Sequence, residues 1–190
     1  MENPDYVYRV FKQHFDKAKL GSGFISLELG PGDSLSSGIV SKALGCSKSY
    51  LVDSGNFAMN NIEIYQKMID YLNQEKKYSL NQISSINELL NTYSVEYLTE
   101  GLTALKNIPD KSVDLIWSQA VLEHIRKSEF LETMLELRRI IRDNGICSHK
   151  VDLKDHLQKA LNNLRFSEQV WESDFMSQSG FYTNRIRYTQ

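Results

Sequence analysis

The sequence predicts an α/β fold, in which a mostly parallel sheet carries helices on both faces. Three observations predict it: short apolar runs alternate with longer segments of helical periodicity, a Gly-Pro-Gly turn follows the first apolar run, and an aspartate ends the second. Strands that are separated by helices pair in parallel, because each helix returns the chain to the same end of the sheet.

The first part of the chain contains one strand–helix–strand unit. In chain order, the predicted elements are a helix over residues 6–18, a strand over 24–29, a helix over 34–44 and a strand over 49–53. The apolar residues of each helix recur every three or four positions, and Gly45 is a typical stop for the second helix. Residues 24–53 therefore form a βαβ unit whose turn is the Gly-Pro-Gly segment.

The rest of the chain repeats this alternation. The predicted elements are a helix over 57–74, a shorter helix over 86–93, a strand over 95–99, a strand over 113–118, a helix over 128–142 and a strand over 146–151. Asn144-Gly145 ends the long helix and turns the chain into the last strand. We expect one domain over residues 1–190, with its core over 24–153, a helical insertion over 57–94 and a lid or substrate-binding segment over 154–190.

Composition and charge argue against several classes of partner. With 22 basic and 24 acidic residues, the 190-residue chain has a formal net charge of −2, which gives no electrostatic footprint for nucleic acid. Cys46 and Cys147 stand far apart and form neither a disulfide framework nor a metal-binding motif. No signal-peptide pattern and no membrane-spanning apolar run is present. We expect a cytoplasmic protein that acts on a small molecule and binds no metal.

The turn Gly30-Pro31-Gly32 lies where a parallel sheet binds its ligands, at the carboxyl end of the first predicted strand. A dinucleotide site needs a third glycine three residues later, and Leu35 stands there instead. Asp33 adds a negative charge near the start of the helix, where the phosphates of a dinucleotide would bind. These features favour a ligand that carries a positive charge and no phosphate.

Two further carboxylates support such a ligand. Glu28 stands just before the turn, where it can face a cationic group. Asp53 ends the second predicted strand, where a carboxylate accepts hydrogen bonds from ribose hydroxyls. The residues thus indicate a positively charged nucleoside.

Four segments resemble the class I S-adenosylmethionine-dependent methyltransferases, in the order and spacing of that family. They are E-L-G-P-G-D-S at 28–34, L-V-D-S at 51–54, S-V-D-L-I-W-S-Q-A-V-L-E-H at 112–124 and R-D-N-G at 142–145. The resemblance covers about residues 24–153. It implies a Rossmann-like fold that binds S-adenosyl-L-methionine, forms S-adenosyl-L-homocysteine as product, and transfers a methyl group to a small acceptor.

The resemblance implies roles for the residues of the glycine turn. Gly30, Pro31 and Gly32 would bring the main chain to the methionine portion of the cofactor. Glu28 or Asp33 would face the ammonium group of that portion.

The resemblance places the ribose and the adenine on the following strand ends. Asp53 would hold the ribose, and Ser54 would lie beside the adenine. Glu100 would bind the adenine amino group, with Gly101 or Leu102 as alternatives for that place. The residues that would close the site from the fourth strand are Ser118 and Gln119.

The chain departs from the family at its carboxyl-terminal side. The family sheet has seven strands, and this sequence offers only five strand candidates. We therefore expect a truncated sheet that lacks the last strands, with Ile186-Arg187-Tyr188 as the opening of a further element.

A base is expected near the end of the fifth strand, because transfer to a hydroxyl requires that its proton be removed. His149 is the candidate base and Asp152 its orienting carboxylate, with His156 as second choice. The alternative is that His149 only hydrogen-bonds at the sheet end. His124 stands where the family sometimes lines its acceptor pocket, or makes a merely polar contact.

The sequence therefore predicts a methyltransferase whose acceptor is an oxygen on a sugar, a lipid-linked compound or another metabolite. Two alternatives stay open: an S-adenosylmethionine-binding module without catalysis, and an NAD-dependent oxidoreductase. The histidines and aspartates of residues 148–156 also allow a metal site, although one strand-to-helix passage would not aim all four side chains at one point.

Overall fold

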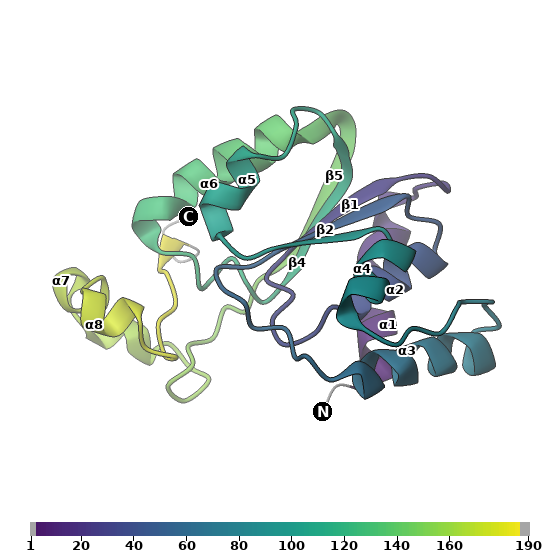
Figure 1. Cartoon of the computed structure of the whole chain (residues 1–190). Coiled ribbons are helices and arrows are strands. Elements are labelled where there is room, and N and C mark those ends of the chain that lie inside the picture. Colours follow the sequence, from purple (N-terminus) through teal and green to yellow (C-terminus); the bar gives the residue numbers. More distant parts are fainter. Residues whose placement is uncertain (1–2, 187–190) are drawn as a thin grey trace.

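Five parallel strands form the centre of the molecule in the computed structural model, which describes residues 3–186 (Figure 1). They are β1 (Ile25–Leu29), β2 (Lys48–Val52), β3 (Val95–Leu98), β4 (Val113–Gln119) and β5 (Ile141–Lys150). Their order across the sheet is β3-β2-β1-β4-β5. The predicted parallel α/β sheet is thus confirmed.

Helices cover both faces of this sheet (Figure 1). Those of the main body are α1 (Pro4–Ala18), α2 (Ser36–Ala43), α3 (Ile62–Glu75), α4 (Ile86–Thr92), α5 (Gly101–Lys106) and α6 (Lys127–Ile140). Helices α1, α2 and α3 lie over one face, and α5 and α6 lie over the other.

Each face of the sheet has its own hydrophobic core. On the first face, the rings of Phe11 and Trp117 meet edge to face at 5.3 Å, and both are buried. On the second face, Ile116 packs with Leu137 of α6. Neighbouring residues of β4 therefore serve opposite cores, as expected where side chains alternate along a strand.

Strand β1 is the point at which the strand order reverses. After β1 the chain moves outward through β2 and β3, and it then returns to pair β4 on the other side of β1. Leu29 at the end of β1 lies between Val52 of β2 and Ser118 of β4. In doubly wound sheets this arrangement leaves a ligand-binding crevice at the carboxyl ends of the central strands.

Several element boundaries differ from those predicted. Helix α3 begins at Ile62 rather than residue 57, because the side chain of Asn61 caps it by accepting the N–H of Glu63. Strand β5 begins at Ile141, so Asn144-Gly145 lies inside the strand, beside an irregularity in its pairing with β4. Helix α5 was not predicted, since six residues are too few to show a helical period.

Two leucines of α6 face solvent rather than the core. Leu131 and Leu135 are 69% and 59% exposed. The buried residues of this helix are Thr133, Leu137 and Ile140. The helix is therefore rotated relative to its most hydrophobic stripe, and its polar Thr133 faces inward.

Residues 152–186, here called the C-terminal unit, contain only short helices. These are a 3-10 helix (Asn162–Arg165), α7 (Glu168–Trp171) and α8 (Asp174–Ser177). Residues 155–161 form no helix: Asp155 is buried, and its carboxylate accepts the N–H groups of Leu157, Gln158 and Asn163 in a turn.

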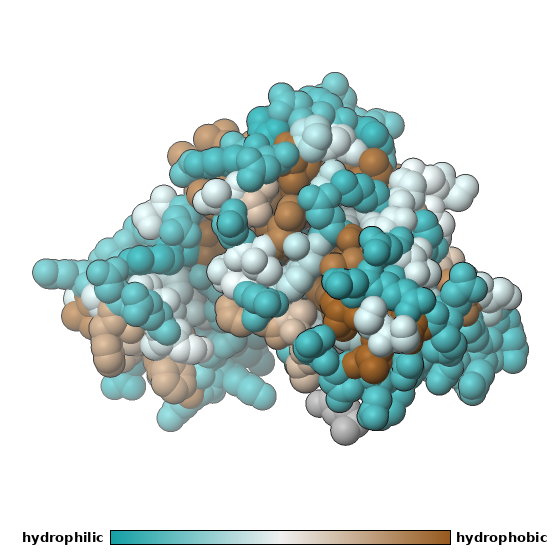
Figure 2. All heavy atoms as spheres, viewed as in Figure 1, coloured by the Kyte–Doolittle hydropathy of each residue, from teal (hydrophilic) through white to brown (hydrophobic). Residues whose placement is uncertain are grey.

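A small core and an apolar surface characterise the C-terminal unit. Trp171 is fully buried, its indole N–H donates to the carbonyl oxygen of Thr183, and its ring lies 5.4 Å from the Arg185 guanidinium. Phe175 is 85% exposed, and Figure 2 shows brown patches over α7 and α8. Among residues 3–186 no strand follows β5. The expected truncation stays a prediction, and Arg187 and Tyr188 lie outside the described residues.

Two absences hold for the part of the chain that the structure describes. No helix within it combines the length and the apolar character that crossing a bilayer requires. Within residues 3–186, no cluster of three or more histidine, cysteine or acidic side chains is placed to hold a metal ion.

Candidate functional site

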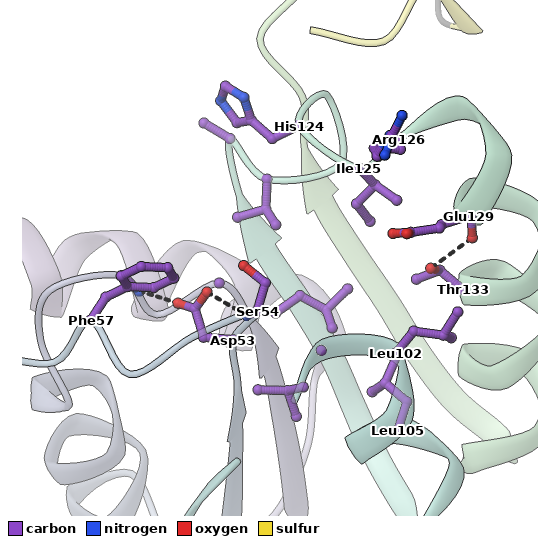
Figure 3. Close-up of a pocket in the computed structure, with 17 residues that line it drawn as sticks. Asp53, Ser54, Phe57, Leu102, Leu105, His124, Ile125, Arg126, Glu129 and Thr133 are labelled. Carbon is purple, nitrogen blue, oxygen red and sulfur yellow. Dashed lines mark hydrogen bonds between the residues drawn. The ribbon is translucent and has the colours of Figure 1, made fainter. Parts of the chain in front are cut away.

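A cavity of about 490 Å³ opens at the carboxyl ends of the central strands (Figure 3). Its walls come from the turn after β1, the loop after β2, the start of α5, the loop after β4 and the first turns of α6. This is the crevice expected where the strand order reverses, and its size suits a nucleoside-sized ligand.

The glycine turn forms one wall of the cavity, and its backbone conformation favours glycine at two positions. Gly30 and Gly32 have φ of +65° and +68°, in the left-handed region that other residues rarely adopt. A Cβ on Gly30 would come within 2.6 Å of a Val121 methyl carbon, whereas a Cβ on Gly32 would meet nothing within 4 Å. The turn therefore exposes main chain to the cavity at both glycines and packs tightly against the β4 loop only at Gly30.

Asp53 joins three of the loops that surround the cavity. Its carboxylate accepts the N–H of Gly32 at 3.0 Å and the N–H of Ser54 at 2.7 Å. Its own N–H donates to the carbonyl oxygen of Leu98, and its carbonyl oxygen accepts the N–H of Gly101. One residue thus ties the glycine turn to the ends of β2 and β3.

The loop after β3 reaches the cavity through only some of the residues predicted there. Gly101, with φ of +52°, and Leu102 line the cavity at the start of α5. Glu100 is exposed and is not among the lining residues. Of the three alternatives for this loop, the structure therefore places Gly101 and Leu102 at the cavity.

The other acidic and turn residues predicted for the cofactor lie outside the cavity wall. Glu28 is buried on β1 and accepts a hydrogen bond from the Ser37 hydroxyl of α2. Asp33 is exposed, and its carbonyl oxygen accepts the N–H of Met59. Pro31 is partly buried and does not line the cavity.

The last residues of β4 belong to the sheet, and the residues that follow them line the cavity. Ser118 is fully buried, and Gln119 does not line the cavity either. The lining begins one residue later with Ala120, whose φ is +56°, and Val121.

His149 lies inside the sheet rather than at the cavity. Its Nδ1 is 2.8 Å from the Ser118 hydroxyl, and burial, with a smaller effect from His14, lowers the pKa of the imidazole to about 4. Asp152 is exposed, and its carboxylate accepts the N–H of Lys154. The structure thus shows His149 in a hydrogen bond at the end of the sheet, which is the alternative to a catalytic role, and its role as a base stays a prediction.

Several lining residues were not predicted. They are Phe57, Leu105, Val121, Ile125, Arg126, Glu129 and Thr133. Three of them belong to α5 and α6, where the Thr133 hydroxyl donates to the carbonyl oxygen of Glu129 (Figure 3), and three more lie in the loop between β4 and α6. Because α5 and the rotation of α6 were not evident in the sequence, no signal marked this wall.

The C-terminal unit contacts the rim of the cavity at the loop after β4. Nδ1 of His124 lies 3.0 Å from the carbonyl oxygen of Tyr182, and the rings of His124 and His156 meet edge to face at 4.7 Å. Arg126 pairs with Asp174 at 3.1 Å. His124 and Arg126 both line the cavity, so the C-terminal unit supports the cavity wall through its contacts with this loop.

Residues 27–148 match a family model described as "Methyltransferase domain". Among solved structures, the chain is similar to a putative S-adenosyl-L-methionine-dependent methyltransferase from Methanococcus maripaludis, with 14% identity and a TM-score of 0.50, over 77% of this chain and 56% of that one. It is also similar to a putative sarcosine dimethylglycine methyltransferase from Galdieria sulphuraria, with 16% identity and a TM-score of 0.45, over 74% of this chain and 43% of that one. At such identities the likeness concerns the fold alone.

Among curated proteins, the chain is 24% identical over 147 residues to human ankyrin repeat domain-containing protein 31. The match covers 76% of this chain and 8% of that protein. The chain thus spans less than a tenth of this relative and about half of each of the two solved structures.

Proposed function

The chain belongs to the methyltransferase domain family and has the fold of S-adenosylmethionine-dependent methyltransferases, and on this premise we propose that it transfers a methyl group from S-adenosylmethionine to a small acceptor. The single observation that carries the proposal is Asp53, which ends β2, lines the cavity and connects the glycine turn to the neighbouring loops.

The residues present fit a positively charged nucleoside. Asp53 uses one lone pair of each carboxylate oxygen on the N–H groups of Gly32 and Ser54, which leaves one on each oxygen for the ribose hydroxyls. Main chain at Gly30 and Gly32 borders the cavity, because neither residue carries a Cβ that would fill it. When bound, S-adenosylmethionine supplies an activated methyl group on its sulfonium.

The same cavity walls offer contacts for the adenine. Leu102 and Val121 offer apolar surface for the adenine, beside Ser54 and Gly101. The roles predicted for Pro31, Glu100, Ser118 and Gln119 stay part of the proposal. Of the two carboxylates predicted for the ammonium group, Glu28 is kept in the proposal, because the Asp33 side chain is exposed to solvent. What the enclosed site adds to the chemistry is alignment, since holding donor and acceptor in line supplies much of the acceleration of a displacement.

We also propose that the acceptor is a small metabolite, with an oxygen as the methylated atom, and that the protein works in the cytoplasm. The cavity supports a small acceptor because its 490 Å³ has to hold the cofactor as well. Two free cysteines, Cys46 and Cys147, suit a reducing compartment. The net charge of −2 favours a partner other than nucleic acid.

Isothermal titration of the chain with S-adenosylmethionine, S-adenosylhomocysteine and NAD tests the proposal. We expect micromolar binding of the first two and none of NAD, with binding lost in Asp53→Ala and kept in Asp33→Ala. Binding of NAD alone would indicate an oxidoreductase. Binding of S-adenosylmethionine without turnover on any acceptor would indicate a binding module.

A further inference from the structure

We propose that Glu129 selects the acceptor of the methyl transfer: the acceptor carries a cationic group, such as an ammonium, which the Glu129 carboxylate binds inside the cavity. The inference rests on the proposed function and names the chemical class of its substrate, a cationic alcohol or phenol. The cationic group serves for recognition and is not methylated, because a protonated or quaternary nitrogen has no lone pair with which to attack the methyl carbon.

Glu129 brings a negative charge into the cavity from the first turn of α6. It lines the cavity together with Thr133, which follows one helical turn later. Figure 3 shows its carboxylate pointing from α6 toward the space between Ile125 and Leu102. The Thr133 hydroxyl donates to the main-chain carbonyl oxygen of Glu129, so its proton is not available to the carboxylate. The Glu129 side chain therefore presents a charged group to a ligand in this part of the cavity.

The basic residues near Glu129 are paired with other carboxylates. These ion pairs are Arg126–Asp174, Lys106–Glu132 and Lys127–Glu168. Arg126 lines the cavity as well, but its guanidinium lies 3.1 Å from Asp174 of the C-terminal unit. Over the described stretch, residues 3 to 186, no side chain forms an ion pair or a hydrogen bond with the Glu129 carboxylate. Its partner therefore has to come from the ligand.

Asp53, the other acidic residue that lines the cavity, has a different position and different contacts. It ends β2, and its carboxylate accepts the N–H groups of Gly32 and Ser54. Figure 3 shows Asp53 and Glu129 on opposite sides of the site. Since the proposed function assigns the cofactor to the glycine turn, Asp53 and Gly101, the α6 side of the cavity is left for the acceptor.

The surroundings of Glu129 favour a cationic acceptor over a neutral one. Leu102, Leu105 and Ile125 line the same part of the cavity and offer the carboxylate no hydrogen bond from their side chains. A bound acceptor displaces water from this carboxylate. A neutral acceptor would then leave the charge without a partner, which is unfavourable, whereas a cationic acceptor forms a charge-assisted contact with it. The cavity thus rejects neutral acceptors as well as binding cationic ones.

The position of Glu129 also has a purely structural explanation. The N-terminal turn of a helix favours an acidic residue because of the helix dipole, and Glu129 stands in that turn of α6. This effect stabilises the helix but does not discriminate between ligands. The two explanations therefore differ in what they predict for the binding of charged and neutral probes.

The first test compares cationic probes with neutral counterparts of similar shape. The ¹⁵N-labelled full chain, saturated with S-adenosylhomocysteine, is titrated with choline against its neutral carbon isostere, and with tyramine against tyrosol, while the main-chain amide shifts are followed. In at least one pair the cationic probe should bind about tenfold more tightly, as expected of a contact with a charged group, and shift the amides around Glu129. Equal affinities within both pairs would overturn the proposal.

Two variants assign this preference to a residue. In Glu129→Gln, the cationic and neutral probes should bind with affinities equal within about twofold, because the amide carries no charge. Glu132→Gln is the matched control: it makes the same change of charge on α6, but Glu132 pairs with Lys106 and does not line the cavity. This control should keep the preference of the parent chain. A preference that survives in Glu129→Gln, or that is lost equally in both variants, would refute the assignment.

A second test separates this inference from the proposed function. S-adenosylmethionine carries a positive sulfonium that S-adenosylhomocysteine lacks. In Glu129→Gln we expect the affinities for both to stay within about twofold of the parent values, whereas a selective loss for S-adenosylmethionine would assign Glu129 to the cofactor and overturn the inference. Absent binding of both by the parent chain would contradict the proposed function, and the probe titrations, repeated without S-adenosylhomocysteine, would still decide whether Glu129 binds cations in the cavity.

Discussion

Replacement of Asp53 by asparagine should weaken both the fold and the cofactor site. The carboxylate accepts two main-chain N–H groups, from Gly32 and Ser54. Asparagine keeps one carbonyl oxygen but turns an NH₂ group toward the other donor, so one bond is lost and the second becomes uncharged. Hydrogen bonds to charged groups contribute about 1.5–3 kcal/mol when shielded, and the partly exposed site reduces this to about 1 kcal/mol for each.

The expected loss in the free energy of unfolding is therefore about 2 kcal/mol. For a domain of this size, that loss lowers Tm by about 4–8 °C. The affinity for S-adenosylmethionine should fall by about 30- to 100-fold, because 1.4 kcal/mol corresponds to tenfold and the ribose loses a charged acceptor. Scanning calorimetry and isothermal titration measure the two effects separately.

Asp33→Asn is the matched control, since it makes the same change of charge directly after the second glycine of the turn. The Asp33 side chain is exposed and does not line the cavity, so Tm and affinity should stay near those of the parent. Equal losses in the two variants would show that charge in the turn matters rather than the Asp53 geometry. Parental stability and affinity in Asp53→Asn would refute the reasoning outright.

Three further predictions concern packing, pH and the C-terminal unit. Gly30→Ala should lower the free energy of unfolding, measured by chemical denaturation, by about 2–4 kcal/mol, because it adds a contact at 2.6 Å with Val121 to the strain of a positive φ. Gly32→Ala has the same backbone strain but open space around its Cβ, so it should lower that free energy by only about 1–2 kcal/mol. Equal losses in the two variants would contradict the contact with Val121. His149 stays neutral in the folded state down to pH about 4, whereas the unfolded chain takes up the proton near pH 6.5. The free energy of unfolding should therefore fall by about 3 kcal/mol as pH falls through this window; His149→Gln should flatten that fall, and an unchanged slope would contradict it. Trp171→Ala should lower the stability of the C-terminal unit by about 3–5 kcal/mol, because it removes a fully buried ring. Limited proteolysis should then cleave within residues 152–186 while the sheet stays protected. Loss of the whole fold would contradict this and show that the unit and the sheet unfold together.

Much of the sheet could be predicted because its strands are continuous apolar runs with clear breaks. The runs at 24–29 and 49–53 form β1 and β2 almost residue for residue, and the Gly-Pro-Gly turn follows the strand at which the order reverses. The start of β5 at Ile141 could not be predicted, since R-D-N-G has the composition of a turn. Its early residues are instead held to β4 by an ion pair between Arg142 and Asp114.

The candidate site also combines residues that the local sequence predicts with residues that only the tertiary structure brings to the cavity. Gly30, Gly32 and Asp53 are set by local chemistry, namely positive φ and the end of a strand, and the sequence predicts all three. Thr133 and Glu129 reach the cavity only because α6 is rotated away from its leucine stripe, which is a tertiary effect. The placement of His124 beside Tyr182 joins segments 58 residues apart, and no local pattern encodes such a contact.

The strand order also dictates when each part of the molecule can form. Strands β1 and β2 are close in sequence, so they can pair early, but the other neighbour of β1, β4, begins only at residue 113. Helix α1 precedes all five strands in the chain, yet its His14 bonds Ser148 of β5. During synthesis, the open side of β1 and the inner face of α1 therefore wait for most of the chain, which gives this fold a slow, late closing step and a period of vulnerability to aggregation.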